Sequence, residues 1–193
     1  MGFNDLRKKS STAGTAPPSV GYGSVPTPIY RFLDENGDGT GNKNANGDYS
    51  STPTEFFIQP PPGQVFRIER MMILIRDSQN QFYTDRYGDV GVLGNGIEIK
   101  TLDDSGVLVN LTDDLPVKTN GEWGKFCYDA EVYPSTMGGT DTYLRARWTF
   151  SRAGYPLRLV GDNNERLAVI LNDDLTGLIE HHFHVQGYIE GTD

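Results

Sequence analysis

The chain has 193 residues and a formal net charge of −9, with 26 acidic against 17 basic residues. Its length fits one domain around a single core, and its acidity argues against binding to the phosphate backbones of nucleic acids. Cys127 is the only cysteine, so an intrachain disulfide is excluded. The sequence shows no signal-peptide pattern and no apolar run long enough to span a membrane, and we therefore expect a protein made in a reducing cytoplasm.

Residues 1–33 differ from the rest of the chain in charge. They hold one acidic residue against four basic ones, among them Arg7, Lys8 and Lys9, so this segment carries +3 and the remainder −12. A basic tail on an acidic body indicates that the tail and the body have different partners. We therefore predict an N-terminal arm over residues 1–33, followed by one domain over residues 34–193.

The composition of the arm supports this division. Residues 10–28 are rich in Ser, Thr, Gly and Pro and hold few large apolar side chains, so they cannot bury enough surface to offset their ordering entropy alone. The arm is either an unstructured tail or a segment extended across a partner. In the second case Tyr22 and Tyr30 are the natural anchors, and Arg7, Lys8 and Lys9 are partner-binding residues.

Residues 34–53 are expected to form a polar loop. Asp34, Asn36 and Asp38, followed by Gly39, resemble the start of a calcium-binding loop, in which alternate side chains supply hard oxygen ligands. The twelfth position, which needs a bidentate glutamate, is Ala45. Asn, Asp and Gly clusters most often form turns, so these three residues are weak candidates for a cation site.

The segment from Glu55 to Ser78 predicts two strands divided by the prolines at 60–62. In the second strand, Phe66 and Ile68 share one face, whereas Met71, Ile73 and Ile75 follow the opposite parity. A change of parity within one strand indicates a β-bulge or a strand that passes between two environments.

Further strand patterns follow at short intervals, and the turn at 103–106 predicts a hairpin between the first two of them. They span residues 97–102, 106–112, 124–133, 142–151, 155–161, 166–172 and 178–190. No helix of any length is indicated. We therefore predict an all-β fold, an antiparallel two-sheet sandwich of jelly-roll type.

Alternation along two of these strands selects candidate surface residues. Tyr143, Arg145 and Arg147 share one face, and such Arg/Tyr strips are typical of protein interfaces. The alternative is cross-strand pairing with Asp or Glu of a neighbouring strand. Near the C-terminus, Glu180, His182 and His184 share a face and could hold a metal, although Phe183 and Val185 opposite them fit an ordinary half-buried strand.

Catalytic motifs are otherwise missing from the sequence. It contains no nucleophile elbow, no Walker motif and no glycine-rich dinucleotide loop between a strand and a helix. Its acidic pairs lie in predicted turns, where solvated carboxylates are usual. We therefore expect a non-enzymatic protein without a cofactor.

One block of sequence resembles a known group of proteins. The stretches "EFFIQPPPGQVFRIERMMILIRDS", "GNGIEIKTLDDSG", "LTDDLPVKTNGEWGKFCYD" and "RWTFSRAGYPLRLVGDNNERLAVILNDDLTGLIEHHFHVQGY" resemble virion structural proteins of tailed bacteriophages. The resemblance covers roughly residues 55–188 and carries no catalytic motif. It implies a location in the virion after assembly in the host cytoplasm, with a structural role.

The function expected from this resemblance is that of a capsid decoration or cement protein. Such a protein bridges subunits of the major capsid protein, and we expect a homo-oligomer, with a trimer favoured, that contacts neither nucleic acid nor membrane. A neck or tail component is the first alternative. A β-sandwich metal- or sugar-binding module or enzyme, using the histidines or a carboxylate pair, is the second.

Overall fold

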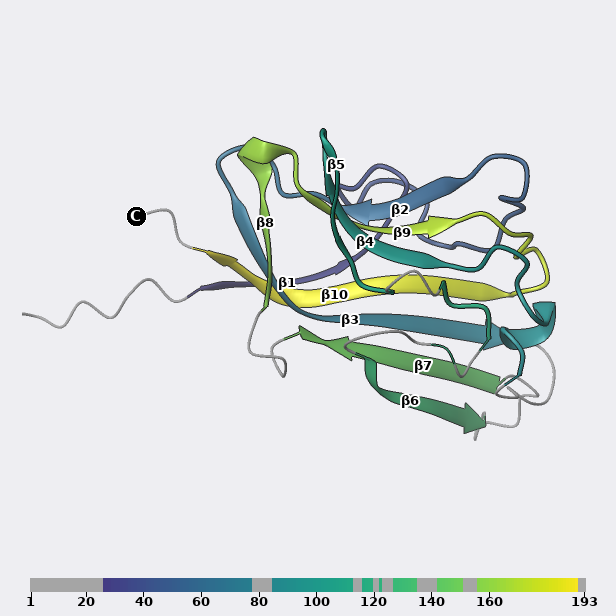
Figure 1. Cartoon of the computed structure of the whole chain (residues 1–193). Helices are drawn as coiled ribbons and strands as arrows, with labels where there is room; N and C mark the ends of the chain where they lie inside the picture. Colours follow the sequence, from purple (N-terminus) through teal and green to yellow (C-terminus); the bar gives the residue numbers. More distant parts are fainter. Residues whose placement is uncertain are drawn as a thin grey trace, which may run out of the picture.

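The computed structural model describes residues 26–77, 85–112, 116–119, 122, 127–134, 142–150 and 156–190, with only the backbone described for 127–134 and 142–144. Two antiparallel sheets pack face to face as a sandwich (Figure 1). The predicted all-β, two-sheet fold is thus confirmed. The described residues hold no helix beyond short 3₁₀ turns such as η2 (Gly88–Val90) and η4 (Gly161–Asn163), and none is long and apolar enough to cross a bilayer.

The larger sheet has the strand order β1-β10-β3-β7-β6, and β8 pairs with the first residues of β3. Its strands are β1 (Thr27–Phe32), β3 (Val65–Asp77), β6 (Cys127–Pro134), β7 (Thr142–Thr149), β8 (Leu157–Val160) and β10 (Glu180–Glu190).

The smaller sheet has the order β2-β9-β4-β5. Its strands are β2 (Thr54–Ile58), β4 (Glu98–Asp103), β5 (Gly106–Asn110) and β9 (Arg166–Leu171). The predicted hairpin is present, because β4 and β5 pair across the turn.

The core fills the space between the sheets. The larger sheet contributes fully buried Phe66, Trp148 and Phe183, and the smaller sheet contributes Phe56 and Val169. Burying a large apolar side chain stabilises a fold by about 1.5–3 kcal/mol, so this layer is the main source of stability in a chain without disulfides.

The parity change predicted in β3 is a β-bulge. Gln186 of β10 pairs with Arg70, but the next residue, Gly187, pairs with Ile68, which leaves Glu69 without a partner in β10. Because of the extra residue, even-numbered side chains face the core before the bulge and odd-numbered side chains face it afterwards. Ile68 is buried before the bulge and Met71 is buried after it. At the same point β3 exchanges β8 for β7 as its second neighbour.

The start of the domain differs from the predicted boundary. Residues 27–32 form β1, which pairs with β10 from Thr27↔Ile189 to Phe32↔His184, and Ile29 and Leu33 belong to the core. Alternation of Ile29 inward with Tyr30 and Phe32 outward makes this run a strand despite the preceding composition. Residues 27–33 are therefore part of the sandwich and not of the arm.

Candidate interaction surface

Four rings gather on the outer face of the larger sheet, the face turned away from the core. Tyr30 and Phe32 come from β1, and His182 and His184 come from β10. Phe183 and Val185 of β10 are fully buried, so the alternate histidines point outward, as the sequence predicted. We call these four side chains the aromatic cluster.

The rings of the aromatic cluster contact one another closely. Phe32 stacks on His184 with centroids 5.5 Å apart and meets His182 edge-on at 5.5 Å. Tyr30 meets His184 edge-on at 5.2 Å, and its hydroxyl lies 2.6 Å from Nδ1 of that histidine. Offset and edge-to-face ring pairs stabilise beyond the area they bury, so this part of the surface is preorganised.

The imidazole of His184 is partly buried. Burial, followed by the charges of His182 and Arg145, lowers the pKa of His184 to about 4. Its Nε2 atom is buried and has no hydrogen-bond partner among the described residues. A neutral imidazole beside exposed Tyr30 gives this part of the surface the mixed apolar and polar character of protein interfaces.

The register continues this surface across β3 and β7. His184 lies opposite Met72 and His182 opposite Leu74, and these residues lie opposite Arg147 and Arg145 in β7. Two predicted groups of partner residues, Tyr30 on one side and the Arg145/Arg147 strip on the other, thus belong to one sheet face, with the histidines between them.

The glutamates that β10 places on this face pair with arginines. Glu180 pairs with Arg76 at 2.9 Å, and Glu190 pairs with Arg67 at 2.9 Å and with Arg158 at 3.6 Å. Arg70, opposite Gln186, is exposed and makes no ion pair with a described residue. The outward glutamates of β10 are therefore neutralised, although the chain as a whole is acidic.

Cross-strand pairing remains open for the arginine strip. The backbone register puts Arg145 opposite Glu131 and Arg147 opposite Asp129 in β6, which is the arrangement the alternative requires. Tyr143 lies opposite Arg76 and Tyr133 in the register, and its side chain lies outside the described part of the chain. Arg7, Lys8, Lys9 and Tyr22 lie outside the described residues as well.

A shallow hollow of about 340 Å³ adjoins the aromatic cluster at the β1 edge. Tyr30, Phe32 and Arg31 line it from β1, and Asp38, Gly39 and Lys43 line it from the following loop. The hollow is shallow, has mixed charges and adjoins an exposed aromatic residue. These features suit a side chain from a partner protein better than they suit a small molecule, which usually binds in a deep apolar pocket.

The three histidines do not converge on a metal. His181 points into the core, where its Nδ1–H donates to the carbonyl of Ala45 at 2.9 Å and its Nε2 accepts from the hydroxyl of Tyr87 at 2.8 Å. The Nδ1–H group of His182 donates a hydrogen bond to the carbonyl of Lys43 at 2.9 Å. In the part of the chain that the structure describes, no group of three His, Cys, Asp or Glu side chains is arranged to hold a metal ion.

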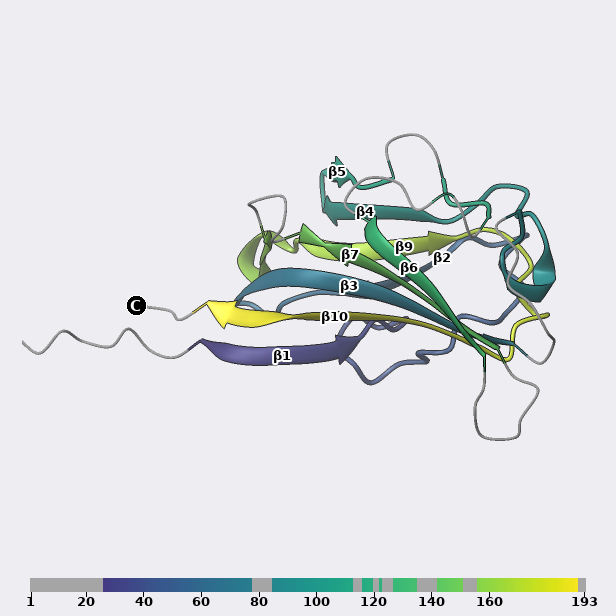
Figure 2. The same cartoon turned by 90° about the horizontal axis from the view of Figure 1, so that it is seen from below.

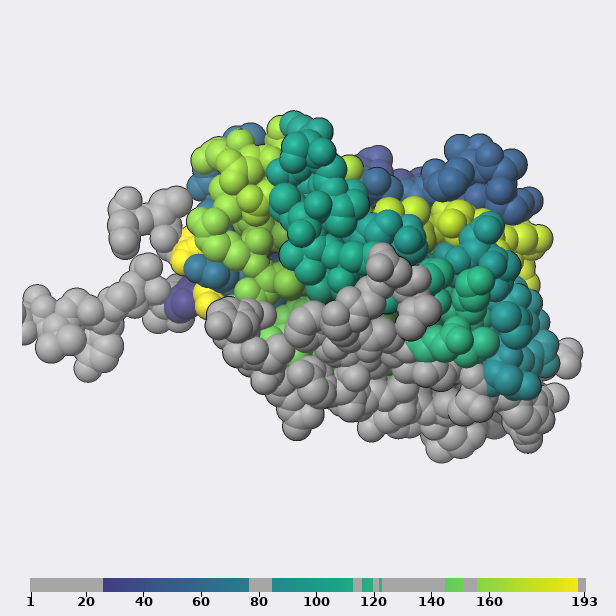
Figure 3. Space-filling model, in the orientation of Figure 1, coloured from purple at the N-terminus to yellow at the C-terminus, as the bar shows by residue number. Residues whose placement is uncertain are grey.

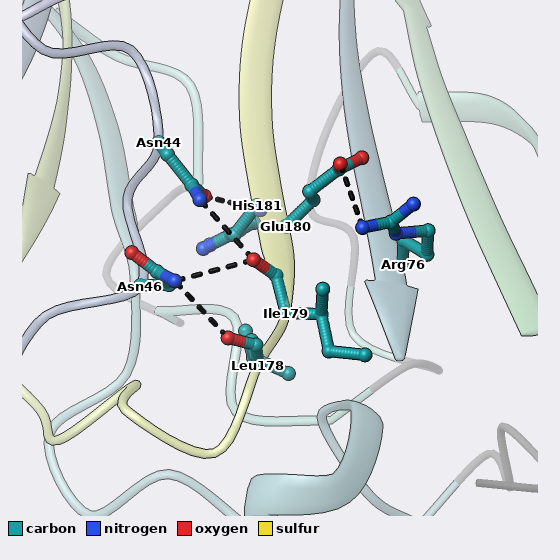
Figure 4. A network of polar contacts seen from close by, with 7 residues as sticks. All are labelled: Asn44, Asn46, Arg76, Leu178, Ile179, Glu180 and His181. Carbon is teal, nitrogen blue, oxygen red and sulfur yellow. Dashed lines mark hydrogen bonds and ion pairs between the residues drawn. The ribbon is translucent and has the colours of Figure 1, made fainter. Parts of the chain in front are cut away.

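The loop after β1 is fastened to the start of β10 by asparagines (Figure 4). Asn44 accepts from the backbone N–H of His181 at 2.8 Å and donates to the carbonyl of Ile179 at 3.1 Å. Asn46 donates to the carbonyls of Leu178 and Ile179, both at 3.2 Å. These bonds cover the edge of β10 beyond the end of β1 and hold the rim of the aromatic cluster in place.

The weak calcium candidates Asp34, Asn36 and Asp38 serve the backbone of the same loop. Asp34 is buried, and its two oxygens accept from the N–H groups of Gly37 at 2.6 Å and Gly41 at 2.7 Å. Asp38 accepts from the N–H and hydroxyl of Thr40, and Asn36 donates to that hydroxyl at 3.2 Å. The three side chains share a loop, but their hydrogen bonds join them to other atoms of the loop and not to a common centre.

Comparison of the chain with protein-family models, with curated proteins and with solved structures found no match. None of these comparisons identifies a phage protein, so the virion setting stays a prediction from the sequence resemblance.

Proposed function

We propose that this chain is a non-enzymatic assembly protein that binds other proteins through the outer face of its larger sheet. The observation that carries the proposal is the aromatic cluster itself. Tyr30 is 55% exposed, the half-buried imidazole of His184 lies beside it, and exposed Arg70 lies on the same face across Gln186 of β10. Interface hot spots are rich in Tyr and Arg residues that surround partly desolvated polar atoms.

The setting that we propose is the particle of a tailed bacteriophage, with the major capsid protein and other virion proteins as partners. This part rests on the sequence resemblance over roughly residues 55–188, and the jelly-roll variant of the sandwich belongs to it as well. A decoration protein must span neighbouring shell subunits against the outward pressure of packaged DNA. A rigid sandwich with one broad face that carries aromatic rings and arginines, and with a cationic N-terminal segment, suits that task, because it offers two separate contact regions.

A neck or tail component uses the same type of surface and differs in copy number and symmetry. The metal- or sugar-binding alternative gains no support from the described residues, where each of the three histidines bonds a protein atom through at least one nitrogen.

The test is an add-back experiment on particles that lack the protein. Full-length protein is mixed with the particles, which are then sedimented, and the bound amount is measured at several protein concentrations. The double variant Tyr30→Ala/Arg70→Glu should bind at least about 30-fold more weakly, which corresponds to the loss of about 2 kcal/mol typical of a hot spot.

The matched control is Val92→Lys, which alters an exposed side chain (63% exposed) outside the larger sheet and should bind as the unaltered protein does. Circular dichroism checks that both variants are folded. Equal binding by the double variant and the control would contradict the proposed surface.

A further inference from the structure

The last strand of the smaller sheet is an exposed apolar edge. Val107, Leu108 and Val109 of β5 are 53%, 46% and 45% exposed, so the strand is open on both of its faces. β5 pairs with β4 on one side, and no described strand pairs with its other side. Figure 3 shows the teal β4–β5 hairpin at the surface, next to the green connection from β8 to β9. Such an edge presents backbone donors and acceptors to another chain.

The β4–β5 pair has a register shift between Thr101 and Leu102, but the edge has no protection from charge or proline. Natural edge strands carry lysines, prolines or inward charges, whereas residues 106–110 hold none of these. Charge begins at the turn: Asp103 accepts from the N–H groups of Ser105 and Gly106, and Asp104 accepts from the side chain of Asn164. Neither carboxylate belongs to an ion pair among the described residues. A strand added to β5 would therefore meet apolar side chains along its length and two carboxylates without a cationic partner at one end.

Two negative ends make β5 a poor partner for a copy of itself. In an antiparallel β5–β5 pair, each end would hold Asp103 and Asp104 of one copy and no basic residue of either β5. Like charges at both ends of a short pair destabilise it. The exposed edge of β5 is instead complementary to an apolar strand that carries basic residues.

The chain holds one segment of that chemistry. Arg7, Lys8 and Lys9 are its only run of three basic residues, and Phe3 and Leu6 precede them. Between this run and Pro26 lie residues 10–25, which can span roughly 50 Å when extended. The segment thus has both the charge and the reach to contact β5 of another molecule.

Contact between two copies and contact within one chain differ in the oligomeric state that they produce. β1 and β5 lie on opposite sides of the sandwich (Figure 2). The described part of the chain begins next to β1, on the side of the sandwich opposite β5. We propose that the N-terminal segment of one copy, around Arg7–Lys9, adds as a strand to β5 of a second copy.

This contact is head-to-tail, because each copy donates its own segment and accepts that of a neighbour. Such contacts close into rings when the rotation between copies allows it. A ring of three copies would agree with the trimer expected from the sequence. The proposal concerns the purified protein alone, so it stands or falls separately from the virion setting.

Two full-length variants separate the donor from the acceptor. Val107→Lys/Val109→Lys keeps the N-terminal segment but charges the β5 edge, and Arg7→Gln/Lys8→Gln/Lys9→Gln keeps β5 but removes the positive charge of the segment. Molar mass is measured by sedimentation equilibrium over a range of concentrations. The unaltered protein should self-associate, and each variant alone should associate at least about tenfold more weakly. An equimolar mixture of the two should form one-to-one dimers and nothing larger, since only one productive contact exists between them.

Val92→Lys is again the control and should associate as the unaltered protein does. Three results would overturn the proposal: an unaltered protein that stays monomeric, a donor variant that associates normally, or a mixture that yields no dimer. The second result would point to pairing of β5 with itself.

Discussion

The hydroxyl of Tyr30 lies 2.6 Å from Nδ1 of His184, although the two residues are 154 positions apart in the chain. This bond joins the first strand of the larger sheet to the last. It also fixes the exposed ring of Tyr30 at the β1 edge of the proposed interaction surface. The geometry of the surface therefore depends on the pairing of the two ends of the domain.

A double-mutant cycle on this pair should show coupling. Tyr30→Phe should lower the free energy of unfolding by about 1 kcal/mol, because Nδ1 of His184 loses its partner. Tyr30→Phe combined with His184→Phe should recover much of that loss, since two apolar rings leave no unsatisfied nitrogen. Urea unfolding of the four proteins gives the coupling energy, and strictly additive effects would contradict the assigned bond.

Acid should destabilise the fold through His181. Complete burial, only partly offset by the bond to Ala45, lowers the pKa of His181 from 6.5 to about 3. Below pH 6.5 the unfolded chain therefore binds a proton that the folded chain does not. The free energy of unfolding should be insensitive to this group above pH 6.5 and fall by about 1 kcal/mol per pH unit between 6.5 and 3.

Urea midpoints measured at pH 7.5, 6 and 5 provide the check. His181→Asn should reduce the slope to the part that His184 contributes, and it should lower stability overall, because its amide keeps one donor and leaves the site underfilled. The outward His182→Gln is the control and should keep the slope of the unaltered protein. An equal slope in the His181 variant would show that other groups cause the acid sensitivity.

Asp173 should be a stability residue and not a functional one. Its nearly buried carboxylate accepts from the backbone N–H groups of Gly94 at 2.8 Å, Asn95 at 3.1 Å and Gly96 at 2.7 Å. Asp173→Ala should cost about 2–4 kcal/mol in thermal or urea unfolding, because charge-assisted bonds are lost and donors are stranded. The exposed neighbour Asp174→Ala should cost under about 1 kcal/mol. A similar cost for both would contradict the assigned role.

Gly187 tests the bulge between β3 and β10. A methyl group there would overlap the backbone carbonyl of Arg67, and the strand cannot move aside without breaking its pairing with β1 or β3. Gly187→Ala should therefore lower the free energy of unfolding by about 2–4 kcal/mol. Gln186→Ala, one residue earlier and facing outward, should cost under about 1 kcal/mol, and equal midpoints for the two variants would refute the register.

Much of the sandwich is readable from local patterns. The parity of Phe66 and Ile68 against Met71 and Ile73 located the bulge, and the turn at 103–106 located a hairpin. Alternation also placed His182 and His184 on one face. These features depend on residues close in sequence, where the two-residue period of a strand leaves few alternatives.

What sequence reasoning missed depends on contacts between distant residues. The run Thr27–Phe32 alternates, but the Pro- and Gly-rich residues before it favoured its assignment to the N-terminal arm. Its partner strand lies at the other end of the chain, so no local signal marks the pairing. The burial of His181 and the fastening of Asn44 and Asn46 to β10 have no local signal either, because each needs a partner more than 130 positions away. The aromatic cluster could be predicted only after β1 and β10 were known to be neighbours.

Copy number and location in purified particles test the central claim most directly. Phage particles of the proposed source are purified, the chain is quantified against the major capsid protein by gel densitometry, and antibody labelling locates it by electron microscopy. Hundreds of copies distributed over the shell are the result that a decoration protein predicts. A dozen or so copies at one vertex would transfer the role to the neck or tail, and absence of the chain from the particles would contradict the account.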